Sequence, residues 1–291
     1  MAKIEGRFER ALAVREPTKV VVRTGSGDVQ ISRGGENQVL VRARFVVRAL
    51  QSQQAQELAE KIKSEPPIEV VGDTITIGDL SKYYEGVSWF FPSISMDFEI
   101  EAPYETEAEL NSGSRDQLIR GIRGPVRAEA GSGDLEITGI EREVTARTGS
   151  GDIKIIEAAA VSAQAGSGDI ALSAIKGDVR LNVGSGDVTL TQIGGNIQCE
   201  TGSGDIRVDS KVGAGVRWQL ETSSGDVSVT LPAEARFALT AETSSGDIEI
   251  DFPLTVSGKL SKRAVRGTVG ESPQAEIHIE TSSGDIRIKK K

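Results

Sequence analysis

The chain is poor in the residue types on which much catalytic chemistry and disulfide-based folding depend. Its 291 residues include one cysteine, Cys199, and one histidine, His278. A single cysteine excludes an intrachain disulfide framework, and a single histidine excludes metal sites built on several histidines. No Ser-His-Asp or Cys-His constellation can be assembled from the pattern. We therefore expect that the protein is not an enzyme and that it carries no cofactor.

Long apolar runs are also missing. No segment approaches the roughly 20 apolar residues that a membrane span requires, and the start MAKIEGRFERALAVREP lacks the apolar run of a signal peptide. We expect no integral membrane segment, and a cytoplasmic location if this start is the native one. The 43 acidic and 34 basic residues give a net charge of -9, which argues against a nucleic-acid partner.

What the chain does contain is a recurring Gly-Ser-Gly-Asp motif. The regular copies repeat every 18 residues, with one spacing of 17 and later units of 21. Regular copies begin at Gly131, Gly149, Gly166, Gly184 and Gly202, a degenerate copy at Gly113, Ser-Ser-Gly-Asp copies at Ser223, Ser244 and Ser282, and the first copy at Gly25. Self-similarity at this period is the signature of a stacked repeat architecture.

The residues within each repeat alternate between apolar and polar, as strands do. Ile153 and Ile155 follow one turn, and Val179 and Leu181 form a second pair later in a unit. One such loop cannot bury its apolar face alone, but stacked loops align these positions into columns. The sequence thus predicts an all-β fold, a right-handed parallel β-solenoid of coils 17–21 residues long. Cys199 falls in the column of Leu181, which predicts a buried apolar filler rather than a reactive thiol.

The segment before the regular coils has a different organisation. We expect residues 1–110 to form strands and a capping segment with one short helix at about 50–64, and residues 111–291 to form the solenoid, as one continuous elongated domain. In the helix, SQQAQELAEKIKSEPP places Ala55, Leu58, Ala59 and Ile62 on one face.

The C-terminal part holds two further expectations. The last segment, SSGDIRIKKK, is expected to form the far end of the stack, where its lysines would discourage pairing with another chain. The insertion 254–274 is expected to be a solvated loop, with basic residues Lys259, Lys262, Arg263 and Arg266.

The repeated aspartates are the candidate site with the clearest pattern. In register they would form a row of carboxylates about 4.8 Å apart, with a repulsion of about 0.9 kcal/mol per neighbouring pair in water. We favour the interpretation that Ser and Asp cap backbone N–H groups at the corners. The alternative is a calcium site like that of β-roll repeats, although here the opposite corner carries no regular acid. The candidate calcium ligands are Asp134, Asp152, Asp169, Asp187, Asp205, Asp226 and Asp247.

Aromatic residues are scarce but clustered. Only 4% of the chain is aromatic, and seven of its twelve aromatic residues lie between Tyr83 and Tyr104. We favour a cap that covers the end of the coils with large rings, and the alternative is an exposed loop that anchors a partner, a second copy or a membrane surface. The candidate partner-binding residues are Tyr83, Tyr84, Trp89, Phe90 and Phe91.

Several stretches together resemble a known family. The TGSGDI units, the start EGRFERALAV, the strand FEIEAP leading into ELNSGSRDQLIRGIRGPV, and the closing SSGDIRI are similar to the bacterial putative-adhesin family of domains of unknown function, also called toast-rack-like. The resemblance covers nearly the whole chain. It implies a β-solenoid without established enzymatic activity and an association with the cell envelope, which would hold here if an export signal had been removed.

Three functional hypotheses follow from these patterns. The first is a non-enzymatic scaffold or adhesin-like interaction protein, with a protein or cell-surface partner and self-association as an option. The second is a calcium-responsive β-roll-like module. The third is a solenoid enzyme acting on carbohydrates, since a pair of carboxylates is the minimum that glycoside hydrolysis requires.

Overall fold

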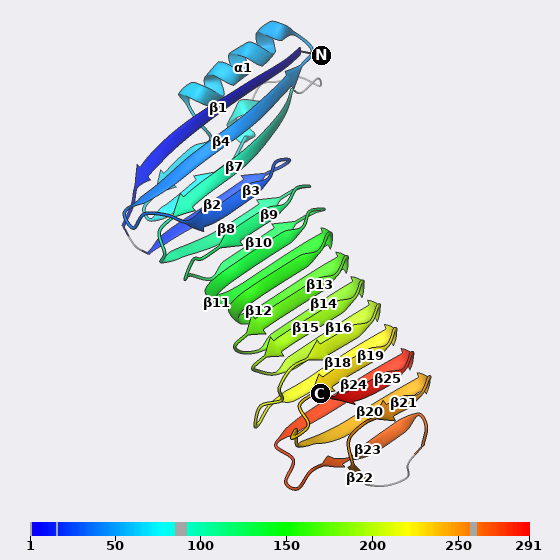
Figure 1. Cartoon of the computed structure of the whole chain (residues 1–291). Helices are drawn as coiled ribbons and strands as arrows, with labels where there is room; N and C mark the ends of the chain where they lie inside the picture. The colour runs from blue at the N-terminus through cyan, green and yellow to red at the C-terminus, as the bar shows by residue number, and fades with distance from the viewer. Residues whose placement is uncertain (1, 16, 85–91, 257–260) are drawn as a thin grey trace. The chain divides into compact units, whose positions relative to one another are not determined.

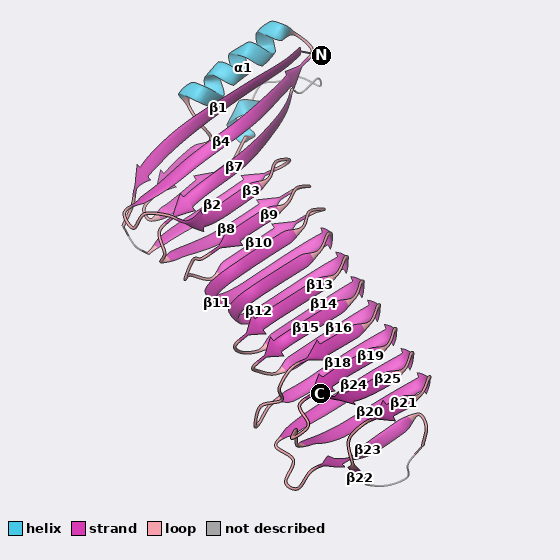
Figure 2. Ribbon diagram, in the orientation of Figure 1, coloured by secondary structure: helices cyan, strands magenta, loops and turns pink. Residues whose placement is uncertain are grey.

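The computed structural model describes residues 2–15, 17–84, 92–256 and 261–291. It divides into two compact units, Met1–Arg142 and Glu143–Lys291. Strands make up most of the described part, as Figures 1 and 2 show, and the two helices found there both lie in the first unit. The protein is an all-β solenoid, as the repeats predicted, while the hand of its winding stays a prediction.

The first unit combines parallel coils with a long antiparallel sheet. Its strands are β1 (Ala2–Ala13), β2 (Thr18–Thr24), β3 (Val29–Arg33), β4 (Gln38–Ala49), β5 (Ile68–Val71), β6 (Thr74–Ile77), β7 (Ser93–Ala102), β8 (Thr106–Ser112), β9 (Gln117–Arg120), β10 (Val126–Ala130) and β11 (Leu135–Ser150), the last of which continues past Arg142. Strands β1, β4 and β7 pair antiparallel, and β7 then pairs in parallel with β3 and β3 with β9. A second layer runs β5, β6, β2, β8 and β10. The first motif copy therefore lies inside the stack, between segments that follow it in the sequence.

The capping helix lies close to its expected place. Helix α1 (Ser52–Ser64) contacts β1 and β4, and Ala55, Ala59 and Ile62 are its buried residues. The i, i+4 and i+7 spacing of these residues puts them on one face, as the apolar pattern indicated. A second helix, α2 (Ser81–Tyr84), is a single turn that the sequence pattern did not indicate.

The second unit consists of stacked coils, each with two strands joined by a motif corner. Its strands are the end of β11, β12 (Ile153–Ser167), β13 (Ile170–Ile175), β14 (Val179–Ser185), β15 (Val188–Ile193), β16 (Ile197–Ser203), β17 (Ile206–Asp209), β18 (Arg217–Ser224), β19 (Val227–Leu231), β20 (Phe237–Ser245), β21 (Ile248–Ile250), β22 (Leu254–Val256), β23 (Ala264–Val269), β24 (Ala275–Ser283) and β25 (Ile286–Lys290). One layer runs β12, β14, β16, β18, β24 and β20, and the other β12, β13, β15, β17, β19, β25 and β21, all parallel.

Apolar columns fill the space between these two layers. Val179 lies opposite Ile197, which lies opposite Trp218, and all three are at most 2% exposed. Burying one such aliphatic side chain contributes about 1.5–3 kcal/mol. Cys199 is fully buried opposite Leu181, as predicted, and burial raises the pKa of its thiol to about 12. It therefore acts as an apolar filler and not as a nucleophile.

The prediction for the C-terminal segment was wrong. Strand β24 pairs with β18 on one side and β20 on the other, and β25 likewise pairs with β19 and β21. The last coil in the sequence is thus inserted between two earlier coils, and its lysines do not protect a free edge. Instead, Lys291 forms an ion pair with Asp209.

The insertion 254–274 also differs from the expected loop. Strand β23 pairs antiparallel with β20, and β22 pairs with β23. Val265 and Val269 of β23 are buried, whereas the basic residues Lys262, Arg263 and Arg266 are exposed, as expected. The insertion therefore covers the edge of β20. Lys259 lies outside the described residues.

Candidate functional site

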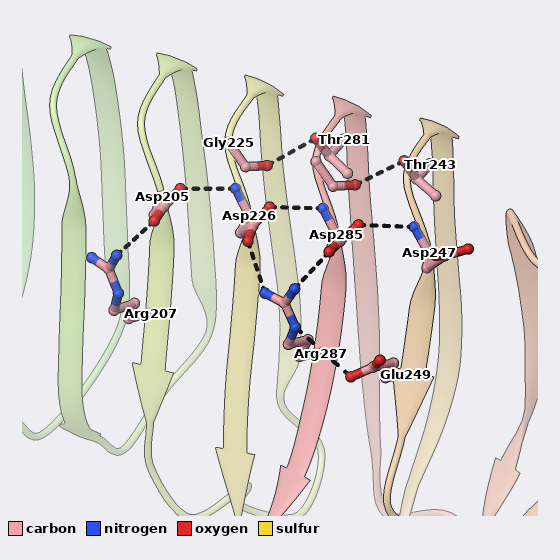
Figure 3. A network of polar contacts seen from close by, with 11 residues as sticks. Asp205, Arg207, Gly225, Asp226, Thr243, Asp247, Glu249, Thr281, Asp285 and Arg287 are labelled. Carbon is pink, nitrogen blue, oxygen red and sulfur yellow. Dashed lines mark hydrogen bonds and ion pairs between the residues drawn. The ribbon is translucent and has the colours of Figure 1, made fainter.

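The repeated aspartates come together as a ladder of hydrogen bonds along the corners. At each step the backbone N–H of one aspartate donates to Oδ1 of the aspartate in the neighbouring coil, at 2.8–3.0 Å. In the second unit the ladder runs through Asp152, Asp169, Asp187, Asp205, Asp226, Asp285 and Asp247. The order at the end follows the inserted coil, so that Asp285 stands between Asp226 and Asp247 (Figure 3).

The first unit contains steps of the same kind. Asp28 N–H donates to Asp97 Oδ1, and Asp134 N–H donates to Asp116 Oδ1, both at 3.0 Å. Asp97 follows no Gly-Ser-Gly turn, and therefore no sequence signal placed it in the row. Asp116 and Asp285 belong to motif copies recognised in the sequence, and the motif could therefore have predicted that both residues join the aspartate row.

Glycine allows the backbones to approach closely at the corners, and in some copies a threonine adds a hydrogen bond to the next coil. A β-carbon on Gly225 would lie 2.1 Å from the carbonyl oxygen of Gly204, because the backbones of neighbouring coils approach so closely. The buried Thr281 hydroxyl donates to Gly225 O at 3.1 Å, and the Thr243 hydroxyl donates to Gly284 O at 3.0 Å (Figure 3). In these copies the threonine and the aspartate each tie one coil to the next, and the glycine permits the close approach of the backbones, while capping by the serine side chain stays a prediction.

Two arginines neutralise part of the ladder. Arg207 bridges Asp187 and Asp205 at 2.8 and 2.6 Å, and Arg287 bridges Asp226 and Asp285 at 2.8 and 2.5 Å. Each arginine lies two residues after a motif aspartate, where its guanidinium reaches two coils at once. The side chains are 34–51% exposed, so that each ion pair contributes at most about 1 kcal/mol.

These contacts shift the titration of two carboxyl groups. The hydrogen bond from Arg207, and then that from the Asp205 backbone, lower the pKa of Asp187. For Asp226 the larger cause is the Asp285 backbone N–H, followed by Arg287, and its pKa is also lowered. Both groups are therefore held in the ionised form by donors from the chain itself.

A group of possible metal ligands occurs elsewhere in the second unit. Among the described residues, the only three acidic, histidine or cysteine side chains with ligand atoms within 4.8 Å of one another are those of Glu221, His278 and Glu280. Glu221 and Glu280 lie opposite each other on β18 and β24, and His278 Nε2 is 3.9 Å from Glu280 Oε2. Sequence reasoning missed this group because the inserted coil joins residues that are far apart in the chain. The ladder aspartates form no such group within the described ranges, and their calcium role stays a prediction.

The aromatic candidates are described only in part. Tyr83 is buried, its hydroxyl donates to the Glu65 carbonyl, and burial raises its pKa to about 12. Tyr84 is half-buried, and burial raises its pKa as well. Trp89, Phe90 and Phe91 lie outside the described residues. Tyr83 is thus buried, and both the capping interpretation and the anchoring role of the aromatic residues stay predictions.

Comparison with known proteins agrees with the fold. The family model described as Toastrack DUF4097 matches residues 18–289, and the chain therefore belongs to this family. No curated protein matches the chain. Neither helix of the described residues has the length and apolar character needed to cross a membrane.

Three solved structures of bacterial proteins show a distant similarity to the chain. A putative cell adhesion protein from Clostridium sporogenes is 15% identical, with a TM-score of 0.23, and the match covers 97% of this chain and 99% of that one. A putative adhesin from Bacteroides fragilis is 13% identical, with a TM-score of 0.35 and 97% of each chain covered. A putative lipid binding protein from Parabacteroides distasonis is 11% identical, with a TM-score of 0.37 and the same coverage.

Proposed function

We propose that this protein is a non-enzymatic, adhesin-like scaffold whose coils hold exposed faces toward a protein or cell-surface partner at the bacterial envelope. The observation that carries the proposal is the ladder. At each described step of the second unit, the motif aspartate accepts a backbone hydrogen bond from the next coil, which supports a role in stacking the coils. Membership of a family that the sequence resemblance associates with the envelope supports the location.

We further propose that the ladder keeps its shape without a metal ion. A carboxylate row needs cations or N–H donors, and here each described step supplies an N–H donor, with Arg207 and Arg287 as cations. Calcium binding at the aspartates remains the alternative, and the measurement that closes the Discussion distinguishes the two.

The second unit offers one face suited to a partner. A groove of about 820 Å³ lies there, and Arg180, Gln198, Arg217 and Glu276 are among its lining residues. Arg180 lies directly opposite Gln198, and Arg217 opposite Glu276, so that neighbouring strands of the parallel layer form a floor of polar side chains. Such a row can make several hydrogen bonds and ion pairs with one partner.

Labelled protein should bind saturably to intact cells of the encoding bacterium. Binding should fall when Arg180→Glu and Arg217→Glu are combined, because the groove then loses its cationic side chains. Flow cytometry over a concentration series measures both effects. The control is the Lys262→Glu, Arg263→Glu variant, which changes the net charge equally at exposed positions outside the groove. Binding that never saturates would contradict the proposed function, and equal loss in both variants would contradict the groove.

A further inference from the structure

Strand β1 has an open edge. All twelve of its residues pair with β4, and among the described residues it pairs with no other strand. Its inward-facing Ile4 and Leu12 are only half-buried, whereas Val41 and Phe45 of β4 are at most 1% exposed. Helix α1 packs against both strands, and Figure 1 shows β1 as the outermost strand of this sheet. A row of backbone N–H and C=O groups is therefore available for another strand.

The outer face of β1 carries charges of alternating sign. Lys3, Glu5, Arg7 and Glu9 are all exposed and point to the same face, because they are two residues apart. Exposed edges are commonly protected by charges or proline, which oppose pairing. Charges of one sign would repel a second copy in every register. Alternating charges repel a copy in some registers and attract it in others.

One antiparallel register makes the edge complementary to itself. Opposite residues in an antiparallel pair share a face, and the two-fold axis therefore passes through a residue position. An axis at Gly6 places Lys3 opposite Glu9 of the second copy and Glu5 opposite Arg7, and symmetry repeats both pairs. On the inner face it places Ile4 opposite Phe8. Gly6 itself brings no side chain to the axis, and the Phe45 ring of its own chain covers it.

The neighbouring registers are less favourable. An axis at Arg7 sets Arg7 against its own copy and Glu5 against Glu9, so like charges meet at each of these pairs. An axis at Phe8 keeps the Arg7–Glu9 pair but leaves Lys3 and Glu5 opposite alanines. Directly opposite ion pairs stabilise antiparallel strands, and like charges destabilise them. The charge pattern therefore selects the register centred on Gly6.

We propose that two copies of this protein join through β1 in the register centred on Gly6, forming one continuous antiparallel sheet across a two-fold axis. The partner is a second copy because the charge sequence is complementary to its own reverse. The backbone groups of the edge supply hydrogen bonds, and the four outer side chains fix the register. The proposal goes beyond the scaffold function and does not depend on the identity of a cell-surface partner.

Sedimentation velocity of the full chain tests the proposal, over about 1 to 200 µM, where weak dimers dissociate. A reversible monomer–dimer equilibrium is expected. An acidic variant, Lys3→Glu with Arg7→Glu, should weaken the dimer by about 100-fold, because four attractive pairs become repulsive. A basic variant, Glu5→Lys with Glu9→Lys, should do the same. An equimolar mixture of the two variants should form a heterodimer, since every pair is then complementary again.

Two controls keep the outcome decisive. Thermal unfolding of each variant should stay cooperative, with only a small change in midpoint, because the ion pairs that the variants remove, Lys3–Glu5 and Glu9–Arg42, are exposed. Such a result shows that the first unit still folds. The Lys262→Glu, Arg263→Glu variant has the same charge change as the acidic variant and should dimerise normally. A protein that stays monomeric throughout, a dimer that neither variant weakens, or a mixture that stays monomeric would each overturn the proposal.

Discussion

Replacing Gly225 with alanine is expected to destabilise the second unit by about 3–5 kcal/mol. Gly225 has a φ of 154°, a backbone conformation that residues other than glycine rarely adopt. A β-carbon there would also lie 2.1 Å from Gly204 O and 2.5 Å from its carbonyl carbon, both backbone atoms. Because these atoms belong to the next coil, the clash can be relieved only by separating two coils. The loss in free energy of unfolding is measured by urea titration, with far-UV circular dichroism as the signal.

Gly213→Ala is the matched control. A β-carbon at Gly213 would make only ordinary contacts, 3.6 Å from Val216 Cγ1 and 3.8 Å from Gly194 O. Its free energy of unfolding should stay within about 0.5 kcal/mol of that of the unmodified protein. Equal stability of the two variants would show that the coils are not stacked as closely at the corner as described.

Asp226→Ala is expected to cost about 1–3 kcal/mol at neutral pH, the usual contribution of a hydrogen bond to a charged group. The change removes the acceptor of the Asp285 N–H, at 2.8 Å, and one of the two carboxylates held by Arg287. Asp226→Asn keeps an acceptor oxygen and should lose less than half as much. The free energy of unfolding from urea titrations at several pH values measures both variants.

The cost of Asp226→Ala should also depend on pH. The pKa of Asp226 is lowered from 3.8 in the folded protein. A lowered folded pKa contributes stability that is present above the unfolded value and is lost as the pH falls through the folded value. The difference between the unmodified protein and Asp226→Ala should therefore be full at neutral pH and shrink below about pH 4. Asp251→Ala is the control, because this exposed aspartate lies outside the ladder and accepts a long hydrogen bond, 3.5 Å, from the Lys290 N–H. A pH-independent difference would rule out the charged ladder as the cause.

The sequence predicted most of the architecture because each repeat carries its own local signals. Alternation placed the strands, the motif placed the corners, and the apolar stripe of Ala55, Ala59 and Ile62 placed the helix. The same regularity hid the order of the coils. Every Ser-Ser-Gly-Asp copy presents the same corner and columns, and nothing local says that β24 belongs between β18 and β20. That long-range choice is also what brings Glu221 beside His278 and Glu280.

One buried position within the apolar columns holds a polar side chain. Gln117 begins the strand of the degenerate copy GSRDQLIR and lies opposite Leu135, in an apolar column, at 1% exposure. Its Nε2 donates to Glu129 O at 2.7 Å, while its Oε1 has no hydrogen-bond partner among the described residues. Burial of an unpaired polar atom costs free energy, and the alternation rule gave no indication of it. The motif predicted that Gln117 begins a strand and faces the core, but not that a polar residue would stand in an otherwise apolar column.

The central claim, that the aspartates form a corner held by the chain's own donors, is tested most directly by thermal unfolding in calcium and in chelator. Far-UV circular dichroism on one preparation gives both midpoints. We predict the same midpoint in both conditions, because the ladder oxygens accept backbone N–H groups and Arg207 and Arg287 supply the positive charge. A ligand that binds only the folded state raises its stability by mass action. A large rise of the midpoint in calcium that Asp226→Ala abolishes would contradict the account and make the aspartate row a metal site.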